Sequence, residues 1–263
     1  MRIVVVGGTG LIGSKVVERL GALGHDVVTA ARSTGVNSFT GEGLERALDG
    51  ARTVIDLSNS SYTDQAGALE FFYASTLNLL TYGRAAGVAH HVALSVVGTD
   101  RLARTERGYF FAKDAQETLI HRSALPYSLV HATQFFEFVR SIADDATRGG
   151  RVHLAEALLQ PIAGDDVAAA VASTALGEPT NTTREFAGPE VYPLSELVRL
   201  ELRAHSDPRE VDADPLARYF GARLEERELL PASDAHRFDT RFPDWLDRQA
   251  ASSPGGGRAR SGG

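Results

Sequence analysis

The chain has 263 residues, 27 basic and 34 acidic side chains, a net charge of −7 and no cysteine. This length suits one large domain. The missing cysteines exclude disulfides, thiol nucleophiles and thiolate metal sites, and the acidic balance argues against nucleic-acid binding. We expect a cytoplasmic monomer or homodimer without a membrane segment, because no apolar stretch could span a bilayer. Only Lys15 and Lys113 are lysines, so 27 − 2 = 25 cations are arginine.

Strands and helices alternate through the first half of the chain. A β-branched run at 2–6 precedes a helical pattern at 11–23, and strands are predicted at 27–31 and 54–57. A helix at 64–86, a strand at 91–95, a helix at 109–121 and a strand at 127–131 follow. This order predicts an α/β fold of the Rossmann type, a doubly wound parallel sheet with helices on both faces.

The second half has weaker patterns. We predict a helix after position 161 with Asp165 or Asp166 as its N-cap, a strand at 184–187 and a helix at 195–205. The chain is therefore expected to form one domain over 1–250. Within it, a small substrate region at about 177–250 would pack on the ligand edge of the sheet. The Gly/Ser-rich end, 251–263, is predicted to be a disordered tail.

The first predicted strand runs into the sequence GGTGLIG at 7–13, which places glycines at 7, 10 and 13 before a helix. Such glycines permit a tight turn and let a pyrophosphate approach backbone N–H groups at a helix N-terminus. The turn predicts a dinucleotide site. Its contacts are expected from Gly7, Thr9, Gly10, Leu11, Ile12 and Gly13.

The second predicted strand ends in AARST at 30–34, where a site that selects NAD usually has a carboxylate. Arg32 and Ser33 instead suit a ribose 2′-phosphate, which favours NADP(H) and leaves NAD(H) open. The alternative is that Arg32 is a solvated loop cation. Ser58, directly after the strand at 54–57, is expected to line the cofactor crevice or to belong to an ordinary polar loop.

Tyr109 and Lys113 are four residues apart on a predicted helix, so they share one face. Ser95 ends a strand, where parallel sheets form their ligand crevice. A free phenol has a pKa near 10 and needs a neighbouring ammonium to exchange protons at neutral pH. We predict Tyr109 as general acid, Ser95 as a donor to the same substrate oxygen, and Lys113 as the residue that binds the nicotinamide ribose and tunes Tyr109. The alternative is a core tyrosine and a surface lysine.

Thr133 and Gln134 follow the strand at 127–131 and are expected to contact substrate beside the nicotinamide. His90 and His91 start a strand at the opposite end of the sheet and have no acidic partner at ligand spacing. They are predicted to be structural, and we predict no metal site.

Together, GGTGLIG, Ser95 three residues before Gly98, and Tyr-x-x-x-Lys at 109–113 resemble the short-chain dehydrogenase/reductase superfamily. The segments HVALSVVGTDR, YFFAKDAQE, ATQFFEF, QPIAGDDVA and DPLARYFG are more similar to its atypical, NmrA-like NAD(P)-binding branch. The resemblance implies a Rossmann fold, NAD(P)(H) and reduction of ketones, quinones or enones. Asn37 and His131 depart from it, because the resemblance implies an adenine-contacting aspartate at the first position and related chains often carry arginine at the second.

The leading hypothesis is an NADP-dependent reductase of a carbonyl, quinone or enone in a small to medium-sized substrate. Two alternatives stay open: an NAD(P)-sensing regulatory protein without turnover, and a redox-neutral isomerase, epimerase or lyase that keeps its nucleotide bound. Many NmrA-like proteins lack the Tyr-Lys pair, so its presence here favours an enzyme.

Overall fold

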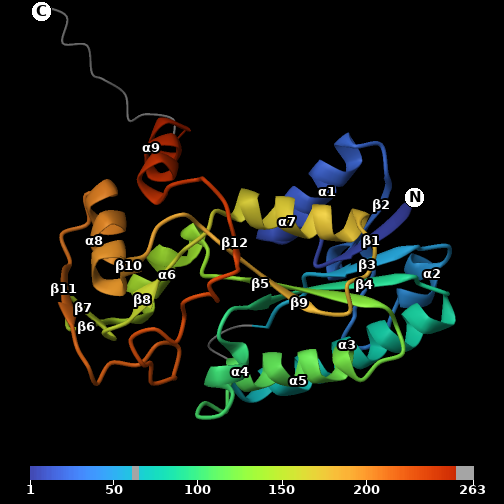
Figure 1. Cartoon of the computed structure of the whole chain (residues 1–263), viewed down its shortest axis with the longest axis horizontal. Helices are drawn as coiled ribbons and strands as arrows, with labels where there is room; N and C mark the ends of the chain where they lie inside the picture. The colour runs from blue at the N-terminus through green and yellow to red at the C-terminus, as the bar shows by residue number, and fades with distance from the viewer. Residues whose placement is uncertain (61–64, 253–263) are drawn as a thin grey trace, which may run out of the picture.

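The computed structural model describes residues 1–60 and 65–252, and within them a seven-stranded parallel sheet is the centre of the molecule (Figure 1). Its strand order is β12-β9-β5-β4-β3-β1-β2. The strands are β1 (Arg2–Val6), β2 (Asp26–Ala30), β3 (Thr53–Asp56), β4 (His90–Val96), β5 (Tyr127–Ala132), β9 (Thr183–Ala187) and β12 (His236–Arg237). The order turns back at β1, with β2 on one side and β3 on the other. Open α/β sheets bind ligands at such a switch point.

Helices cover both faces of this sheet. Figure 1 shows α1 (Leu11–Ala22) and α7 (Gly164–Leu176) on one face, and α3 (Gln65–Ala85) and α5 (Tyr109–His121) on the other. The side chains of β1 alternate between the two cores, because Ile3 and Val5 pack in the cluster with α1 and α7 while Val4 and Val6 pack in the cluster with α2 (Leu44–Leu48) and α3. Short helices η1 (Arg32–Thr34), α2 (Leu44–Leu48) and α4 (Thr99–Leu102) fill the connections.

Shorter elements pack beside the carboxyl ends of the strands. They are η2 (Phe136–Phe138), α6 (Val139–Asp145), β6 (Thr147–Arg148), β7 (Arg151–Leu154), β8 (Leu158–Leu159), β10 (Tyr192–Pro193), α8 (Leu194–Ala204), β11 (Glu210–Ala213) and α9 (Phe242–Ser252). One hydrophobic cluster joins α6, α8 and α9 to α3 and α5. Strands β9 and β12, from the predicted substrate region, extend the main sheet.

The parallel sheet and its alternating helices confirm the predicted fold class, and the helix predicted at 109–121 has the observed bounds. The predicted cap of α7 is wrong. The helix begins at Gly164 with Ala163 as N-cap, because the Glu137 carboxylate accepts the Gly164 N–H at 3.0 Å and leaves Asp165 and Asp166 in the first turn.

The predicted start of the tail is also wrong, because α9 includes residues 251 and 252. Position 64 of the predicted 64–86 helix and the rest of the predicted tail, 253–263, lie outside the described residues. No helix in the described ranges combines the length and apolar character needed to cross a bilayer.

Candidate active site

The glycine turn between β1 and α1 is fixed by backbone contacts. Gly7 has a φ of +76°, and its N–H donates to the Ala30 carbonyl at the end of β2 at 2.9 Å. A Cβ on Gly13 would lie 2.1 Å from the Gly7 oxygen, and one on Gly7 would lie 2.7 Å from the Leu57 oxygen. The turn therefore tolerates only glycine at these positions, which leaves its backbone bare beside a hollow.

That hollow has a volume of about 760 Å³ and runs from the glycine turn past the end of β2 to the loop after β3. It includes the predicted cofactor residues Gly7, Thr9, Gly10, Arg32, Ser33 and Ser58. Arg32 is exposed and forms no ion pair within the described part of the chain. Asn37 also lines the hollow, and its side-chain oxygen accepts the Phe39 N–H at 3.1 Å.

A second hollow, of about 160 Å³, connects the glycine turn to the predicted catalytic residues. Ser95, Tyr109 and Lys113 line it together with Leu11, Ile12 and Gly13. The fold thus brings three segments that are far apart in the sequence, the turn after β1, the end of β4 and the start of α5, to one place.

Lys113 is buried, with 2% of its surface exposed. Its ammonium donates to the Leu94 carbonyl at 2.8 Å and to the Gln116 side chain at 2.5 Å, and it lies 4.7 Å from the centre of the Phe72 ring. The Gln116 amide donates in turn to Asp56 at 2.9 Å. Desolvation lowers the pKa of Lys113 to about 8, against the opposing charges of Asp56 and Glu117.

Ser95 hydrogen bonds to a partner that the sequence analysis did not identify. Its hydroxyl donates to Glu117 Oε1 at 2.5 Å, and the same oxygen lies 3.0 Å from His131 Nε2. Burial alone would raise the pKa of Glu117, but the hydrogen bonds and charges of His131, Ser95 and Lys113 outweigh it and lower the pKa. Since a hydroxyl carries one hydrogen, Ser95 in this geometry offers only acceptor lone pairs to the hollow. This differs from the expected role as a donor.

Tyr109 is 3% exposed and lies at the first position of α5. Its hydroxyl donates to Asn59 Oδ1 at 2.9 Å, which connects the helix to the loop after β3. The Tyr109 ring packs edge-on against Phe72 and Phe110. These contacts place the phenol at a fixed point in the wall between two hollows.

The further hollow, which we call the apolar pocket, has a volume of about 280 Å³ and shares Val96, Tyr109, Phe135 and Phe138 with the second hollow of about 160 Å³. Its other lining residues are Phe110, Thr133, Gln134, Ser141, Asp145, Tyr219 and Phe220. The predicted substrate residues Thr133 and Gln134 are therefore in its wall. Tyr219 and Phe220 belong to the predicted C-terminal substrate region, so part of that region also lines the apolar pocket.

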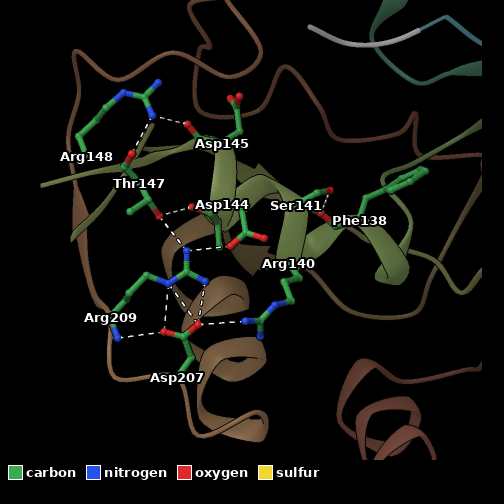
Figure 2. Close-up of polar contacts among 10 residues, drawn as sticks. Phe138, Arg140, Ser141, Asp144, Asp145, Thr147, Arg148, Asp207 and Arg209 are labelled. Carbon is green, nitrogen blue, oxygen red and sulfur yellow. Dashed lines mark hydrogen bonds and ion pairs between the residues drawn. The ribbon is translucent and has the colours of Figure 1, made fainter. Parts of the chain in front are cut away.

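Helix α6, which carries part of the pocket wall, is held in place by an ion-pair cluster (Figure 2). Arg209 contacts Asp144 at 2.8 Å and Asp207 at 2.8 Å, and Arg140 contacts Asp207 at 3.2 Å. Hydrogen bonds from the Arg209 guanidinium lower the pKa of Asp207 to about 2. The cluster fixes α6 to the loop before β11.

A larger hollow, of about 1020 Å³, lies between α7, β9 and residues 232–238, away from the glycine turn. None of its described lining side chains leaves a buried polar atom without a hydrogen-bond partner. We therefore place the site at the glycine turn.

Sequence reasoning missed Glu117, His131 and Asn59 as parts of the site. Glu117 had a signal, because it continues the four-residue spacing from Tyr109 and Lys113 on one helix face. Asn59 and His131 had none, because their contacts depend on how β3, β5 and α5 pack together.

About half of the chain matches a known protein family. Residues 3–132 match the NAD dependent epimerase/dehydratase family. The matched stretch runs from β1 to the end of β5 and contains the glycine turn, Ser95, Tyr109 and Lys113.

Solved structures share the fold over almost the whole chain. A UDP-glucose 4-epimerase from Thermotoga maritima has a TM-score of 0.73 at 18% identity and covers 95% of this chain and 98% of its own. The dTDP-glucose 4,6-dehydratase DesIV from Streptomyces venezuelae, solved with NAD, has a TM-score of 0.69 at 18% identity, with 95% and 96% covered.

A curated relative is 26% identical over 151 residues, the photosystem II assembly factor Ycf39 of Synechocystis. The match covers 52% of this chain and 46% of the relative, so it spans about half the length of that protein.

Proposed function

We propose that the protein is a nicotinamide-dependent reductase of a carbonyl, quinone or enone, with NADP(H) as the favoured cofactor. The observation that carries the proposal is the position of Tyr109, which lies in the wall of both the hollow of about 160 Å³ beside the glycine turn and the apolar pocket. A cofactor in the first and a substrate in the second would meet at the phenol.

The residues of the turn fit a dinucleotide. Added Cβ atoms at Gly7, Gly10 and Gly13 would each come within 3.2 Å of backbone, so the tight turn requires glycine, and a pyrophosphate would bind against its bare backbone. Arg32, which lacks an ion-pair partner among the described residues, would bind the 2′-phosphate together with Ser33. When bound, the nicotinamide would supply hydride to the substrate carbon.

In the proposed reaction, the Tyr109 hydroxyl turns from Asn59 Oδ1 to the substrate and gives its proton to the carbonyl oxygen, which becomes the hydroxyl of the product. The nearby Lys113 ammonium stabilises the phenolate that remains and would contact the ribose hydroxyls. Ser95, whose hydrogen is donated to Glu117, would accept the hydrogen bond of the product hydroxyl. The aromatic side chains that line the apolar pocket would exclude water from the reacting atoms.

Tyr109→Phe tests this assignment. We expect the dissociation constant of NADPH to stay within about twofold and carbonyl-dependent NADPH oxidation to fall roughly 10²- to 10⁴-fold, because the proton donor is lost. Tyr73→Phe, at an exposed tyrosine on α3, is the matched control and should retain full activity. Unchanged turnover in Tyr109→Phe would remove the phenol from the mechanism.

A binding protein without turnover is the second candidate, and the name of the curated relative, an assembly factor, supports it. This candidate predicts NADPH binding but no NADPH oxidation with any carbonyl compound. The third candidate, a redox-neutral epimerase or dehydratase of the kind found among the structural neighbours, would turn over a sugar nucleotide with no net consumption of NADPH.

A further inference from the structure

Two polar side chains in the wall of the apolar pocket have no hydrogen-bond partner among the described residues. Gln134 is 8% exposed, and both its amide nitrogen and its amide oxygen are buried without a hydrogen bond in the described part of the chain. Thr133 is 1% exposed, and its hydroxyl is also buried without a hydrogen-bond partner among the described residues. Buried polar groups in folded proteins are normally paired, so these atoms indicate a ligand group that would complete them.

The rest of the pocket wall selects against anions. Six aromatic rings line it, and Phe135 and Phe138 stack with their centres 5.3 Å apart. Its described lining contains no lysine, arginine or histidine, and Asp145 adds a negative charge. A diphosphate here would lose its water without gaining a cation, which is unfavourable.

The volume of about 280 Å³ lies near the lower end of the range for small-molecule sites, about 300–1,000 Å³. A pocket of this volume suits a ligand that has one ring or two fused rings. Because Tyr109 shares the wall, a ring ketone in the pocket would place its carbonyl at the phenol and its far side against other wall residues.

We propose that this pocket binds an uncharged aromatic ketone that carries a hydroxyl group away from the reducible carbonyl, and that Gln134 pairs with this hydroxyl. The inference rests on the proposed reductase function, since Tyr109 defines which end of the substrate reacts. It assigns the protein an aromatic substrate class in place of the sugar nucleotides bound by its structural neighbours.

The test compares two ring ketones that differ by one oxygen, 7-hydroxy-1-tetralone and 1-tetralone. For the wild-type protein we expect kcat/KM to be about tenfold higher for the hydroxylated ketone, because it completes a buried amide that the other leaves unpaired. Isothermal titration calorimetry on the protein saturated with NADP⁺ should give the same preference in dissociation constants. UDP-glucose should show no binding at millimolar concentration.

Gln134→Leu should remove the preference or reverse it, because the hydroxyl would then be buried without a partner. Phe220→Leu is the control in the same pocket, and it should weaken both ketones alike and keep the ratio. If Gln134→Leu fails to fold, as judged by circular dichroism, Gln134→Met retains the side-chain length and tests the same loss of pairing.

The outcomes separate the two proposals. Binding with the expected preference but without NADPH oxidation would overturn the reductase function and leave the substrate class intact. Equal kcat/KM for the two ketones, a preference that survives in Gln134→Leu, binding of neither ketone, or binding of UDP-glucose would each overturn the substrate class.

Discussion

The ammonium group of Lys113 is surrounded by β3, β4 and α5, and its protonated form is disfavoured there because it has lost water. Its pKa is about 8 in the folded protein, against an ordinary value of 10.5. Between these two pH values the unfolded chain holds a proton that the folded chain has released. The free energy of unfolding therefore rises with pH across this window.

Lys113→Met should show this effect. Each pKa unit corresponds to about 1.4 kcal/mol, so we expect the stability advantage of Lys113→Met over the wild-type protein to shrink by about 3 kcal/mol between pH 7 and 10.5. Urea unfolding of the cofactor-free proteins measures it. Lys15→Met, at the part-exposed ion pair with Asp165, controls for loss of a cation alone. A difference that stays constant with pH would contradict the desolvation of Lys113.

Residue spacing was enough to place some of the candidate site and not the rest. A helix fixes positions four apart on one face, so Tyr109 and Lys113 could be paired from the sequence. The partners of Ser95 could not, because Glu117 and His131 meet only when α5 packs against β5. A local pattern carries no information on such a contact.

At the scale of elements, the turn between β1 and α1 depends on missing side chains. In Gly13→Ala the new methyl group would lie 2.1 Å from the Gly7 oxygen and 2.7 Å from Gly8 Cα, so the backbone must move. We expect NADPH affinity to fall at least tenfold and stability to fall by about 1–3 kcal/mol. Fluorescence titration with NADPH and urea unfolding are the measurements.

Gly21→Ala, in the same helix, is the matched control. A Cβ at Gly21 meets nothing within 4 Å, so alanine should raise stability by about 0.5–1 kcal/mol and leave NADPH affinity unchanged. If Gly13→Ala bound NADPH as tightly as Gly21→Ala, the turn would not be the cofactor site.

The long elements were predictable and the short ones were not. Buried β-branched runs and helical spacing identified the strands and helices that build the sheet and its layers. Elements such as β8 and β10 have two residues each, and they exist because Tyr192 and Leu159 pair across the chain. Their sequences have no period long enough to detect, so the small sheets beside the pocket were missed.

At the scale of the whole molecule, a bound cofactor should stabilise the folded state, because a dinucleotide would contact segments from β1 to α5. NADPH at one hundred times its dissociation constant should add about 2.7 kcal/mol, which for this size raises the melting temperature by about 5–10 °C. In Arg32→Glu, the rise in melting temperature with NADPH should be no larger than the rise with NADH. Arg104→Glu, on a surface pair with Asp100, makes the same change in net charge and should behave as the wild-type protein. Equal shifts with NADPH and NADH in the wild-type protein would contradict the 2′-phosphate assignment.

Because lysine is scarce, the protein offers few sites to amine-directed reagents. The sequence contains only two lysines, and Lys113 is inaccessible in the folded state. Of the two lysines, only Lys15 is therefore accessible to mild acylation of the native protein. Dyes or surface tethers can be attached there without touching the proposed active site, whereas Lys113 lines the hollow beside Ser95 and Tyr109, so a bound cofactor should protect it from any label.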